Sequence, residues 1–484
     1  MCSLVSIKDL SREEVEFFIN DALQRKKAFP KQQCTGKVLA SLFYENSTRT
    51  RESHERAARR LGMDVIGFSG TEGTSVKKGE PLADTLRMYE GYGTDVVVLR
   101  HPLEGAARYA AEILNIPVIN AGDGSNAHPT QTLLDLMTLK ENHGSIDNLR
   151  IALVGDLKYG RTVHSLITAL RLFNNIQLWL VAPDTLQMPS HLVAEFEKAT
   201  GTKATQTQNL TDVLAKVDII YMTRIQRERF PEGPEGEYEY KKVSGIYCIT
   251  PEMLKNNYVG IMHPLPRYKN LLEISMDVDH LPNAWYIEQA RNGLYMREAI
   301  LFKLLLNPAS KRAAQQKKQI WEDLPIAHGQ KRGEHMVYRL DNGTLIDHIP
   351  AGNGKNVLKV LALPEDMQLI YAHNLRSSHY GKKDVLGFTD RELSEKELNK
   401  VALIAPEATI NIIKDQKVMK KGKIILPSVI EDLVICPNPR CITAVQHHEH
   451  VLQKMLVVSH DPLVLRCHYC ELPIKREEIV LQEN

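Results

Sequence analysis

Short apolar runs alternate with stretches of helical periodicity from residue 38 to about residue 300. Such alternation predicts parallel β-sheets that are covered by the helices connecting their strands. Ligands bind sheets of this kind beyond the carboxyl ends of the strands, so the residues that follow each run are candidates for a site. The predicted strands span residues 38–43, 96–99, 151–154, 178–181, 219–222 and 259–262.

The alternating region divides into two predicted α/β lobes. We expect the first lobe at residues 1–140 and the second at 141–286, with helices in 287–306 packing back on the first lobe. A cleft between two such lobes is a natural place for an active site. The following stretch, 307–334, is polar and has no apolar stripe, which predicts a linker.

A smaller α+β pattern follows the linker, and we expect a domain over residues 335–428 and a small β domain over 429–484. Ser394-x-x-Glu397 resembles a capping box that opens a helix. The other predicted elements are strands near 336–340, 369–373 and 408–413 and a helix near 357–363.

Length and charge exclude several classes of protein. A chain of 484 residues is too long for one hydrophobic core. Its 61 basic and 59 acidic side chains favour neither nucleic acid nor an anionic membrane as a partner. No apolar run approaches the roughly 20 residues of a membrane span, and the first residues do not build a signal peptide. We therefore expect a cytoplasmic protein that binds anions only locally.

Four of the seven cysteines cluster near the C-terminus. Cys436-x4-Cys441 and Cys467-x2-Cys470 supply four thiolates from two short loops, which is the pattern of a closed structural zinc site. Disulfide pairing is the alternative, and it is uncommon in a cytoplasmic chain. His447, His448 and His450 lie between the pairs and compete as ligands in principle, but a solvated loop is the simpler interpretation.

The first predicted strand runs into Ser47-Thr48-Arg49-Thr50-Arg51 and then into a helix. The hydroxyls and the Arg49 guanidinium therefore fall at a helix N-terminus, where free N–H groups and the helix dipole favour a phosphate dianion. The alternative is an ordinary N-cap with solvated arginines.

Two further motifs follow predicted strands of the first lobe. Arg100 ends a buried strand, where a charge needs a partner or a ligand. Pro129 suits the first position of a helix, which places His128 and Gln131 on its opening turn. These side chains could polarise a carbonyl group and hold a neighbouring NH2 group. A turn with a structural histidine is the alternative.

Arg161 and Arg224 follow predicted strands of the second lobe, and together they suit a dicarboxylic substrate. The Gly155-Asp156 turn resembles nucleotide-binding turns only weakly, since it lacks the G-x-G-x-x-G spacing. Taken in order, the motifs resemble those of aspartate carbamoyltransferases over residues 1 to about 306. The matching motifs are Ser47 to Arg51, Arg100-His101-Pro102, His128-Pro129-Thr130-Gln131 and His263-Pro264-Leu265-Pro266-Arg267.

The resemblance implies a role for each motif. Ser47, Thr48, Arg49 and Thr50 would bind the phosphate of carbamoyl phosphate, and Arg100, Thr50 and His128 would polarise its carbonyl oxygen. Gln131 and the backbone carbonyls of Leu265 and Pro266 would hold the carbamoyl NH2. The resemblance also assigns L-aspartate to Arg161, Arg224 and Gln226, and Ser75 and Lys78 to the site of a neighbouring subunit in a catalytic trimer.

The sequence departs from the family pattern at three positions. The loop hydroxyl next to the lysines is either Thr74 or Ser75, of which we choose Ser75. His54 stands where a phenylalanine is usual, which should affect packing more than chemistry. Gly387 stands where a lysine that contacts nucleotides is expected, which should weaken or alter effector binding.

The part after the linker resembles the regulatory chain of the same enzyme, through Ile346-Asp347-His348-Ile349-Pro350 and the final cysteines. The chain therefore resembles a catalytic-regulatory fusion in which the cysteine domain docks on a catalytic subunit and the α+β domain binds ATP or CTP. The positions that match the effector pocket are Asp347, His348, Lys383, Val418 and Lys421. Two alternatives remain: an ornithine-type carbamoyltransferase and a non-catalytic metabolite sensor.

Overall fold

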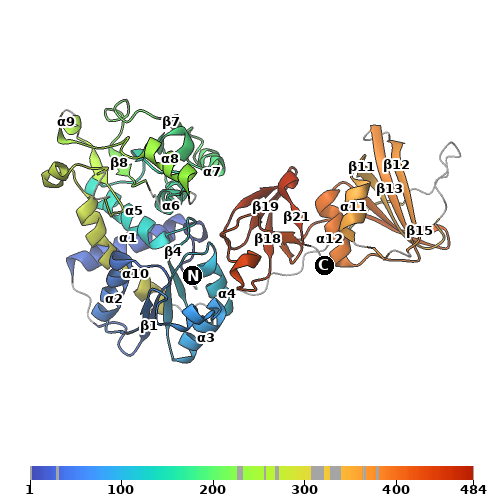
Figure 1. Cartoon of the computed structure of the whole chain (residues 1–484), viewed down its shortest axis with the longest axis horizontal. Helices are drawn as coiled ribbons and strands as arrows, with labels where there is room; N and C mark the ends of the chain where they lie inside the picture. Colours follow the sequence, from blue (N-terminus) through green and yellow to red (C-terminus); the bar gives the residue numbers. More distant parts are fainter. Residues whose placement is uncertain are drawn as a thin grey trace. The chain divides into compact units, whose positions relative to one another are not determined.

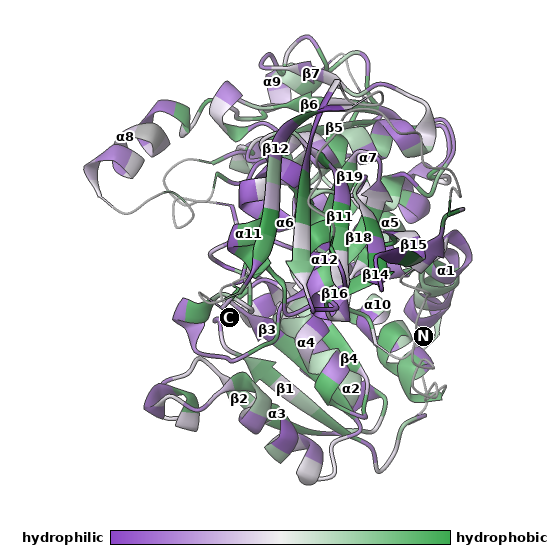
Figure 2. Ribbon diagram, turned by 90° about the vertical axis from the view of Figure 1, so that its right-hand side faces the viewer, coloured by the Kyte–Doolittle hydropathy of each residue, from purple (hydrophilic) through white to green (hydrophobic). Residues whose placement is uncertain are grey.

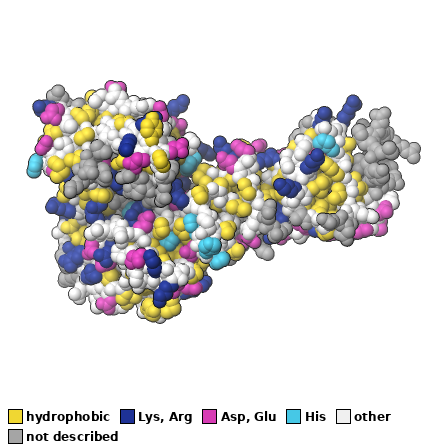
Figure 3. Space-filling view, viewed as in Figure 1, with side chains coloured by type: hydrophobic (Ala, Val, Ile, Leu, Met, Phe, Trp, Pro, Cys, Tyr) yellow, Lys and Arg dark blue, Asp and Glu magenta, His cyan; other side chains and the backbone are white. Residues whose placement is uncertain are grey.

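The computed structural model describes residues 3–28, 32–225, 230, 233–255, 258–267, 272–306, 321–326, 340–361, 363–364, 367–377 and 381–482. They form two compact units, one built mainly from residues 1–312 and the other mainly from residues 313–484 (Figure 1). None of the helices in these ranges is both long and apolar enough to cross a bilayer. On the face shown in Figure 3, basic and acidic side chains are interspersed, in line with the near-zero net charge.

The first lobe of the larger unit is a four-stranded parallel sheet in the order β2-β1-β3-β4. The strands β1, β3 and β4 are buried almost throughout, because helices cover both faces of the sheet. The elements are α1 (Arg12–Lys27), β1 (Val38–Phe43), α2 (Thr48–Arg60), β2 (Asp64–Ser69), α3 (Leu82–Gly91), β3 (Val96–His101), α4 (Ala106–Ile113), β4 (Val118–Asp123) and α5 (Pro129–His143).

The second lobe is a five-stranded parallel sheet in the order β7-β6-β5-β8-β9. The strands of the first lobe carry many hydrophobic residues (Figure 2), and both sheets alternate with helices along the chain, so the expected α/β architecture is confirmed. The elements are β5 (Arg150–Val154), α6 (Arg161–Leu170), β6 (Gln177–Val181), α7 (Ser190–Thr200), β7 (Thr205–Thr207), β8 (Ile219–Met222), α8 (Pro234–Val243), α9 (Pro251–Leu254) and β9 (Gly260–Met262).

One long helix, α10 (Tyr286–Leu306), connects the second lobe back to the first. It packs against α1, α2 and α5 of the first lobe and also contacts β9. A single hydrophobic cluster includes Leu39 and Val98 of the first sheet together with Leu153 and Met262 of the second. The two lobes therefore share a core, which holds the carboxyl ends of their strands around one site.

The smaller unit contains a six-stranded antiparallel sheet in the order β10-β15-β14-β11-β13-β12 and two helices. Helix α12 begins with the predicted capping box, because Ser394 and Glu397 each accept a hydrogen bond from the other's backbone N–H. The elements are β10 (Trp321–Asp323), β11 (Gly343–Pro350), α11 (Gly354–Leu361), β12 (Leu369–Ser377), β13 (Gly381–Thr389), α12 (Glu395–Ile404), β14 (Thr409–Lys414) and β15 (Lys417–Ile424).

Part of the expected linker forms a strand. Trp321–Asp323 pairs with the edge of β15 as β10, and Lys420 Nζ lies 4.3 Å from the centre of the Trp321 ring. A strand of three residues is too short to show an alternation of apolar and polar positions, and the surrounding sequence is polar. The sequence therefore did not predict it. Residues 307–320 and 327–334 lie outside the described residues, and so do residues 336–339 of the strand expected near 336–340.

The C-terminal part of the smaller unit holds two small antiparallel sheets. One has the order β16-β18-β19-β20, and the other pairs β17 with β21. The elements are β16 (Val429–Glu431), β17 (Val434–Ile435), β18 (Lys454–His460), β19 (Leu463–Cys467), β20 (Pro473–Lys475) and β21 (Val480–Leu481).

Candidate active site

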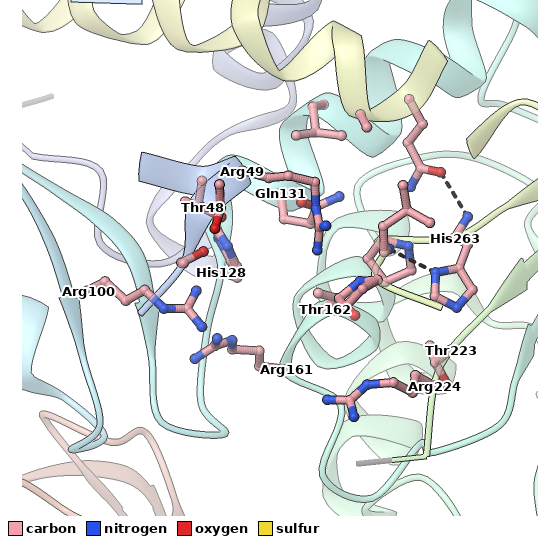
Figure 4. A pocket seen from close by; sticks show the side chains of 18 of the residues that line it. Thr48, Arg49, Arg100, His128, Gln131, Arg161, Thr162, Thr223, Arg224 and His263 are labelled. Atoms are coloured by element: carbon pink, nitrogen blue, oxygen red, sulfur yellow. Dashed lines mark hydrogen bonds between the residues drawn. The ribbon is translucent and has the colours of Figure 1, made fainter. Parts of the chain in front are cut away.

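A cavity of about 660 Å³ lies between the two lobes, at the carboxyl ends of β1, β3, β8 and β9 (Figure 4). Nine of the residues whose side chains the sequence marks for the site line it. They are Ser47, Thr48, Arg49, Thr50, Arg100, His128, Gln131, Arg161 and Arg224. Leu265 and Pro266 line it as well, whereas Gln226 lies outside the described residues.

The N-terminus of α2 forms one wall of this cavity. Ser47 occupies the N-cap position, yet its side chain accepts no hydrogen bond from the helix, and no acidic residue stands in the first turn. The first N–H groups of α2 and the hydroxyls of Ser47 and Thr48 are therefore available to a ligand, and the helix dipole favours an anion there. This arrangement argues against the ordinary N-cap interpretation.

Among the described residues, five arginines line the cavity: Arg49, Arg100, Arg161, Arg224 and Arg297. Among the described lining residues they face a single carboxylate, that of Glu45. Glu45 Oε2 lies 3.4 Å from Arg100 Nε and 3.7 Å from Arg161 Nη1, so it holds arginines of both lobes. The remaining positive charge suits a ligand with several negative charges.

Arg100 and Arg161 point toward each other across the cavity, and Arg224 reaches toward it from the other side (Figure 4). Arg161 is the first residue of α6, and its Nη1 donates to the Gly124 carbonyl at 2.8 Å. Arg224 follows Thr223, whose hydroxyl donates to the Val154 carbonyl and accepts from the Asp156 N–H, both at 2.9 Å. These bonds fix the backbone from which Arg224 extends.

His128 caps α5, and Pro129 takes the first helical position, as predicted. The His128 N–H donates to Ser165 Oγ at 3.1 Å, which ties the start of α5 to the second lobe. Burial and the nearby charges of Arg161 and Arg100 hold the pKa of the His128 imidazole well below its usual value. The ring is therefore neutral and can donate one N–H to a carbonyl oxygen in the cavity.

The neutral state of His128 is testable without substrate. In the full chain with 13C-labelled histidine rings, the His128 signal should show no titration between pH 8 and pH 6.5, because protonation would place another charge among the arginines. The signal is assigned as the one that disappears in His128→Asn. A titration midpoint at or above 6.5 would contradict the burial of a neutral ring.

The loop after β9 closes the cavity. Leu265 has a φ of +54°, and its N–H donates to His263 Nδ1 at 2.8 Å. The His263 N–H donates in turn to Gln289 Oε1 at 2.8 Å. Burial, followed by the charge of Arg267, lowers the pKa of His263 to about 3, so this ring stays neutral and can accept the Leu265 bond. The loop thereby presents Leu265 and Pro266 to the cavity.

Ser75 and Lys78 do not line this cavity but lie in an exposed 3-10 turn (Ser75–Lys78). Thr74 Oγ1 donates to the Thr71 carbonyl at 2.7 Å, which leaves the Ser75 hydroxyl as the more exposed of the two candidates. Lys77 pairs with Glu72 at 2.6 Å, whereas the Lys78 ammonium has no ion pair within the described part of the chain.

Residues 3–141 match the family model of the aspartate/ornithine carbamoyltransferase carbamoyl-P binding domain, and residues 147–304 match that of the Asp/Orn binding domain. The chain belongs to the aspartate/ornithine carbamoyltransferase family. Residues 335–425 and 428–480 match the allosteric and metal binding domains of the aspartate carbamoyltransferase regulatory chain. The expected fusion of catalytic and regulatory parts is therefore confirmed.

Comparison of the chain with individual proteins indicates the same family. The chain is 51% identical to the aspartate carbamoyltransferase catalytic subunit of Thermococcus onnurineus over 62% of its own length and 95% of that protein. It resembles the solved catalytic subunit of M. jannaschii with 47% identity and a TM-score of 0.58, over 63% and 99% of the two chains. A Trypanosoma cruzi aspartate transcarbamoylase solved with carbamoyl aspartate and phosphate is 37% identical, with a TM-score of 0.56 over 62% and 95%.

The four cysteines of the segment that matches the metal binding domain lie together and are buried. Their sulfur atoms all lie within 4.8 Å of one another, and Cys436 Sγ and Cys470 Sγ are 3.6 Å apart. Sulfurs bound to one tetrahedral metal at about 2.3 Å would be separated by roughly 3.8 Å, so the four thiols fit a metal ion. Cys436, Cys441, Cys467 and Cys470 therefore form a structural metal site, not disulfides.

The structure brings three of the five expected effector residues together. Lys383 Nζ lies 2.6 Å from Asp347 Oδ1, and His348 Nδ1 lies 3.4 Å from Asp347 Oδ2. Val418 and Lys421 are on β15, and β14 separates this strand from β11, which carries Asp347.

A side chain at Gly387, such as the lysine that the family pattern predicts, would contact apolar neighbours closely. A Cβ at this position would lie 2.8 Å from Leu340 Cδ1 and 3.3 Å from Ile370 Cβ. Such contacts would force the neighbouring apolar side chains to move. Gly387 therefore lacks the positive charge of the expected lysine, and apolar side chains pack closely around its position on β13.

The structure also shows pocket residues that we did not predict. Glu45, Thr162, Gln289 and Arg297 line the cavity. Glu45, Gln289 and Arg297 contact residues distant in the sequence. Glu45 follows the buried strand β1 closely. Because residues that follow such strands are candidates for a site, its position in the sequence could have indicated it.

Proposed function

We propose that the cavity transfers the carbamoyl group of carbamoyl phosphate to the amino group of L-aspartate. The observation that carries this proposal is the arrangement of charge. An anion-binding helix end in one lobe faces Arg161 and Arg224 of the other across one cavity, and Glu45 supplies the single carboxylate among the described residues that line it. A phosphorylated donor on one side and a dicarboxylic acceptor on the other match that distribution.

The donor would lie against the first lobe. Ser47, Thr48, Arg49 and Thr50 would bind its phosphate through hydroxyls, backbone N–H groups and the guanidinium. Arg100, the Thr50 hydroxyl and the neutral His128 would donate to its carbonyl oxygen. Gln131 Oε1 and the carbonyls of Leu265 and Pro266 would accept from its NH2 group.

The acceptor would lie against the second lobe, with Arg161, Arg224 and Gln226 binding its carboxylates. Its neutral amine would then sit against the carbamoyl carbon. The amine nitrogen forms the new C–N bond, the bond from that carbon to the phosphate oxygen breaks, and the leaving phosphate takes the amine proton. The protein contributes position and charge stabilisation, so no side-chain base is needed.

Ornithine fits the cavity less well than aspartate. Its side-chain ammonium needs an acidic partner, yet the one carboxylate among the described lining residues, that of Glu45, is already held between Arg100 and Arg161. The acceptor side of the cavity instead carries Arg161 and Arg224, whose positive charges would repel that ammonium. Charge complementarity therefore favours aspartate.

The proposed reaction is tested by one assay of the purified full chain with carbamoyl phosphate and either aspartate or ornithine, measuring the ureido product. We expect a product with aspartate and at most a trace with ornithine. Product formed only with ornithine would overturn the choice of acceptor. No product with either would favour a metabolite sensor.

Arg224→Ala should raise the KM for aspartate about 100-fold, because removing one partner of a close charge pair typically costs several kcal/mol. The KM for carbamoyl phosphate should stay within a few-fold of wild type, since the donor side of the cavity is intact. Initial rates over both substrates measure the two constants. Arg171→Ala is the matched control, because Arg171 pairs with Glu195 at 3.0 Å and does not line the cavity.

If Arg171→Ala raised the KM for aspartate as much as Arg224→Ala did, a general disturbance of the second lobe would explain the effect. Equal losses of affinity for both substrates in Arg224→Ala would likewise contradict a separate aspartate side.

Ser75 and Lys78 would complete the site of a neighbouring subunit in a catalytic trimer, because neither lines the cavity of its own chain. Co-expressed Lys78→Ala and Arg49→Ala chains should therefore recover about a quarter of wild-type activity, as each site would combine chains from the two pools at random. Each variant alone should be nearly inactive. Mixed oligomers without recovered activity would place Lys78 in its own chain's site or outside any site.

In the regulatory part, zinc is the metal that four buried thiolates at this spacing would hold. Asp347, His348, Lys383, Val418 and Lys421 would line a site for ATP or CTP. The loss of a cation at Gly387 supports weaker nucleotide binding than in relatives that have a lysine there.

A further inference from the structure

Asp135 is a buried carboxylate beneath the cavity, and the mechanism above does not use it. It lies on α5 one turn after Gln131, and its side chain is fully buried. A buried carboxylate is expensive unless several donors satisfy it. Two of the side chains that satisfy Asp135, those of Gln131 and Gln289, also line the cavity.

Three side chains donate to Asp135, and they come from three different elements. Gln131 Nε2 on α5 donates to Oδ1 at 2.8 Å, and Gln289 Nε2 on α10 donates to the same oxygen at 2.7 Å. The Tyr221 hydroxyl on β8 donates to Oδ2 at 2.8 Å. The carboxylate thus joins α5, α10 and the second lobe at one point.

These bonds determine how Gln131 faces the cavity. An ionised carboxylate only accepts hydrogen bonds, so a glutamine beside it must turn its NH2 group toward the carboxylate. The other end of the amide, Oε1, then remains for the cavity, where it is an acceptor. A glutamine without this partner could present either end.

The same carboxylate reaches the loop after β9 through Gln289. With its Nε2 held by Asp135, Gln289 presents Oε1 to the His263 N–H at 2.8 Å. His263 Nδ1 then accepts from the Leu265 N–H at 2.8 Å. The chain of bonds ends at the Leu265–Pro266 segment that lines the cavity.

We propose that Asp135 is a positioning residue that aligns all three acceptors of the carbamoyl NH2 group: Gln131 Oε1 and the backbone carbonyls of Leu265 and Pro266. It thereby selects a donor with an NH2 group next to the carbonyl over one with a methyl group. This inference rests on the proposed function.

The charge state of Asp135 agrees with this role. Burial raises the pKa of its carboxyl to about 7, and the hydrogen bonds from Gln289, Tyr221 and Gln131 oppose that rise. At pH 8 the ionised form therefore predominates, and it can accept all three bonds at once.

The test compares two stable ligands that differ only in this group, phosphonoacetamide and acetonylphosphonate. Calorimetry at pH 8 on the full chain gives the ratio of their dissociation constants. Wild type should prefer the amide, and Asp135→Leu should lower that preference about tenfold or more, because a misaligned acceptor loses the hydrogen bonds that distinguish NH2 from CH3. Affinity for inorganic phosphate should remain within about threefold, since the N-terminus of α2 is unchanged.

Two variants separate positioning from general destabilisation. Asp135→Asn keeps an acceptor for the two glutamines and should retain most of the preference. Tyr221→Phe removes one donor without touching either amide, so it should change the preference by less than threefold. If Asp135→Leu fails to bind phosphate, Asp135→Ala, which admits water to the two amides, takes its place.

An unchanged preference in an Asp135→Leu or Asp135→Ala protein that binds phosphate normally would overturn the inference. Equal weakening of both ligands would overturn it as well. Failure of the proposed function is distinguishable, because wild type would then form no ureido product from carbamoyl phosphate and aspartate.

Discussion

Arg49→Ala should lower kcat by roughly 10²–10³-fold, the range found when one donor to developing charge is removed. Arg49 lies in the first turn of α2 and lines the cavity, where its guanidinium would hold the phosphate as the bond to the carbamoyl carbon breaks. The helix N–H groups remain in the variant, so binding of carbamoyl phosphate should weaken less than turnover. Steady-state rates with both substrates saturating measure the change.

Arg51→Ala is a matched control on the same helix. Arg51 Nη2 lies 2.5 Å from Glu52 Oε1, its Nη1 lies 3.7 Å from Glu55 Oε1, and the residue does not line the cavity. Its kcat should stay within about twofold of wild type, as expected for a surface ion pair. An Arg49→Ala enzyme whose kcat remains within a few-fold of wild type would contradict the assignment of the phosphate to this helix end.

Removing the metal should unfold the domain that the four cysteines hold. Structural zinc contributes roughly 10–16 kcal/mol of apparent binding free energy in small zinc domains, and most of it appears as folding free energy. In Cys441→Ser, or after chelation, the amides of residues 428–480 should lose their protection against hydrogen exchange. The amides of the larger unit's sheets should keep theirs, because their core does not include the cysteines.

Cys248→Ser is the control for the metal prediction, because Cys248 stands apart from the cluster. The full chain should contain one zinc per polypeptide by elemental analysis, and Cys248→Ser should contain the same amount. Unchanged exchange protection in a Cys441→Ser protein shown to be free of metal would mean that the domain folds without an ion.

Much of the fold could be predicted because the central strands are continuous apolar runs. β1 and β8 begin and end at the predicted residues, 38–43 and 219–222, since both faces of these strands are buried. β2 was not predicted, because Asp64–Ser69 is half exposed and carries too few apolar residues. β10 was not predicted for a different reason: its residues form a strand because they pair with β15, about one hundred residues further along the chain.

Residues of the candidate site were predictable where a charged side chain stands at the end of a buried strand. Arg100 and Arg224 could be found in this way, since each closes or follows a buried strand. Asp135 could not be assigned a role from the sequence, because its partners on other elements are distant in it. Asp135 meets Gln289, for example, 154 positions away.

In the proposed site, one cavity binds the donor's phosphate against its first lobe and the acceptor's carboxylates against its second. N-(phosphonacetyl)-L-aspartate, the ligand in a solved Trypanosoma cruzi aspartate transcarbamoylase, joins both groups in one molecule. Calorimetry of the full chain with this compound therefore measures both interactions together. We predict one molecule bound per chain, with binding weakened at least about tenfold by Arg49→Ala and, separately, by Arg224→Ala. Absence of binding, or binding that neither variant weakens, would contradict this arrangement of the site.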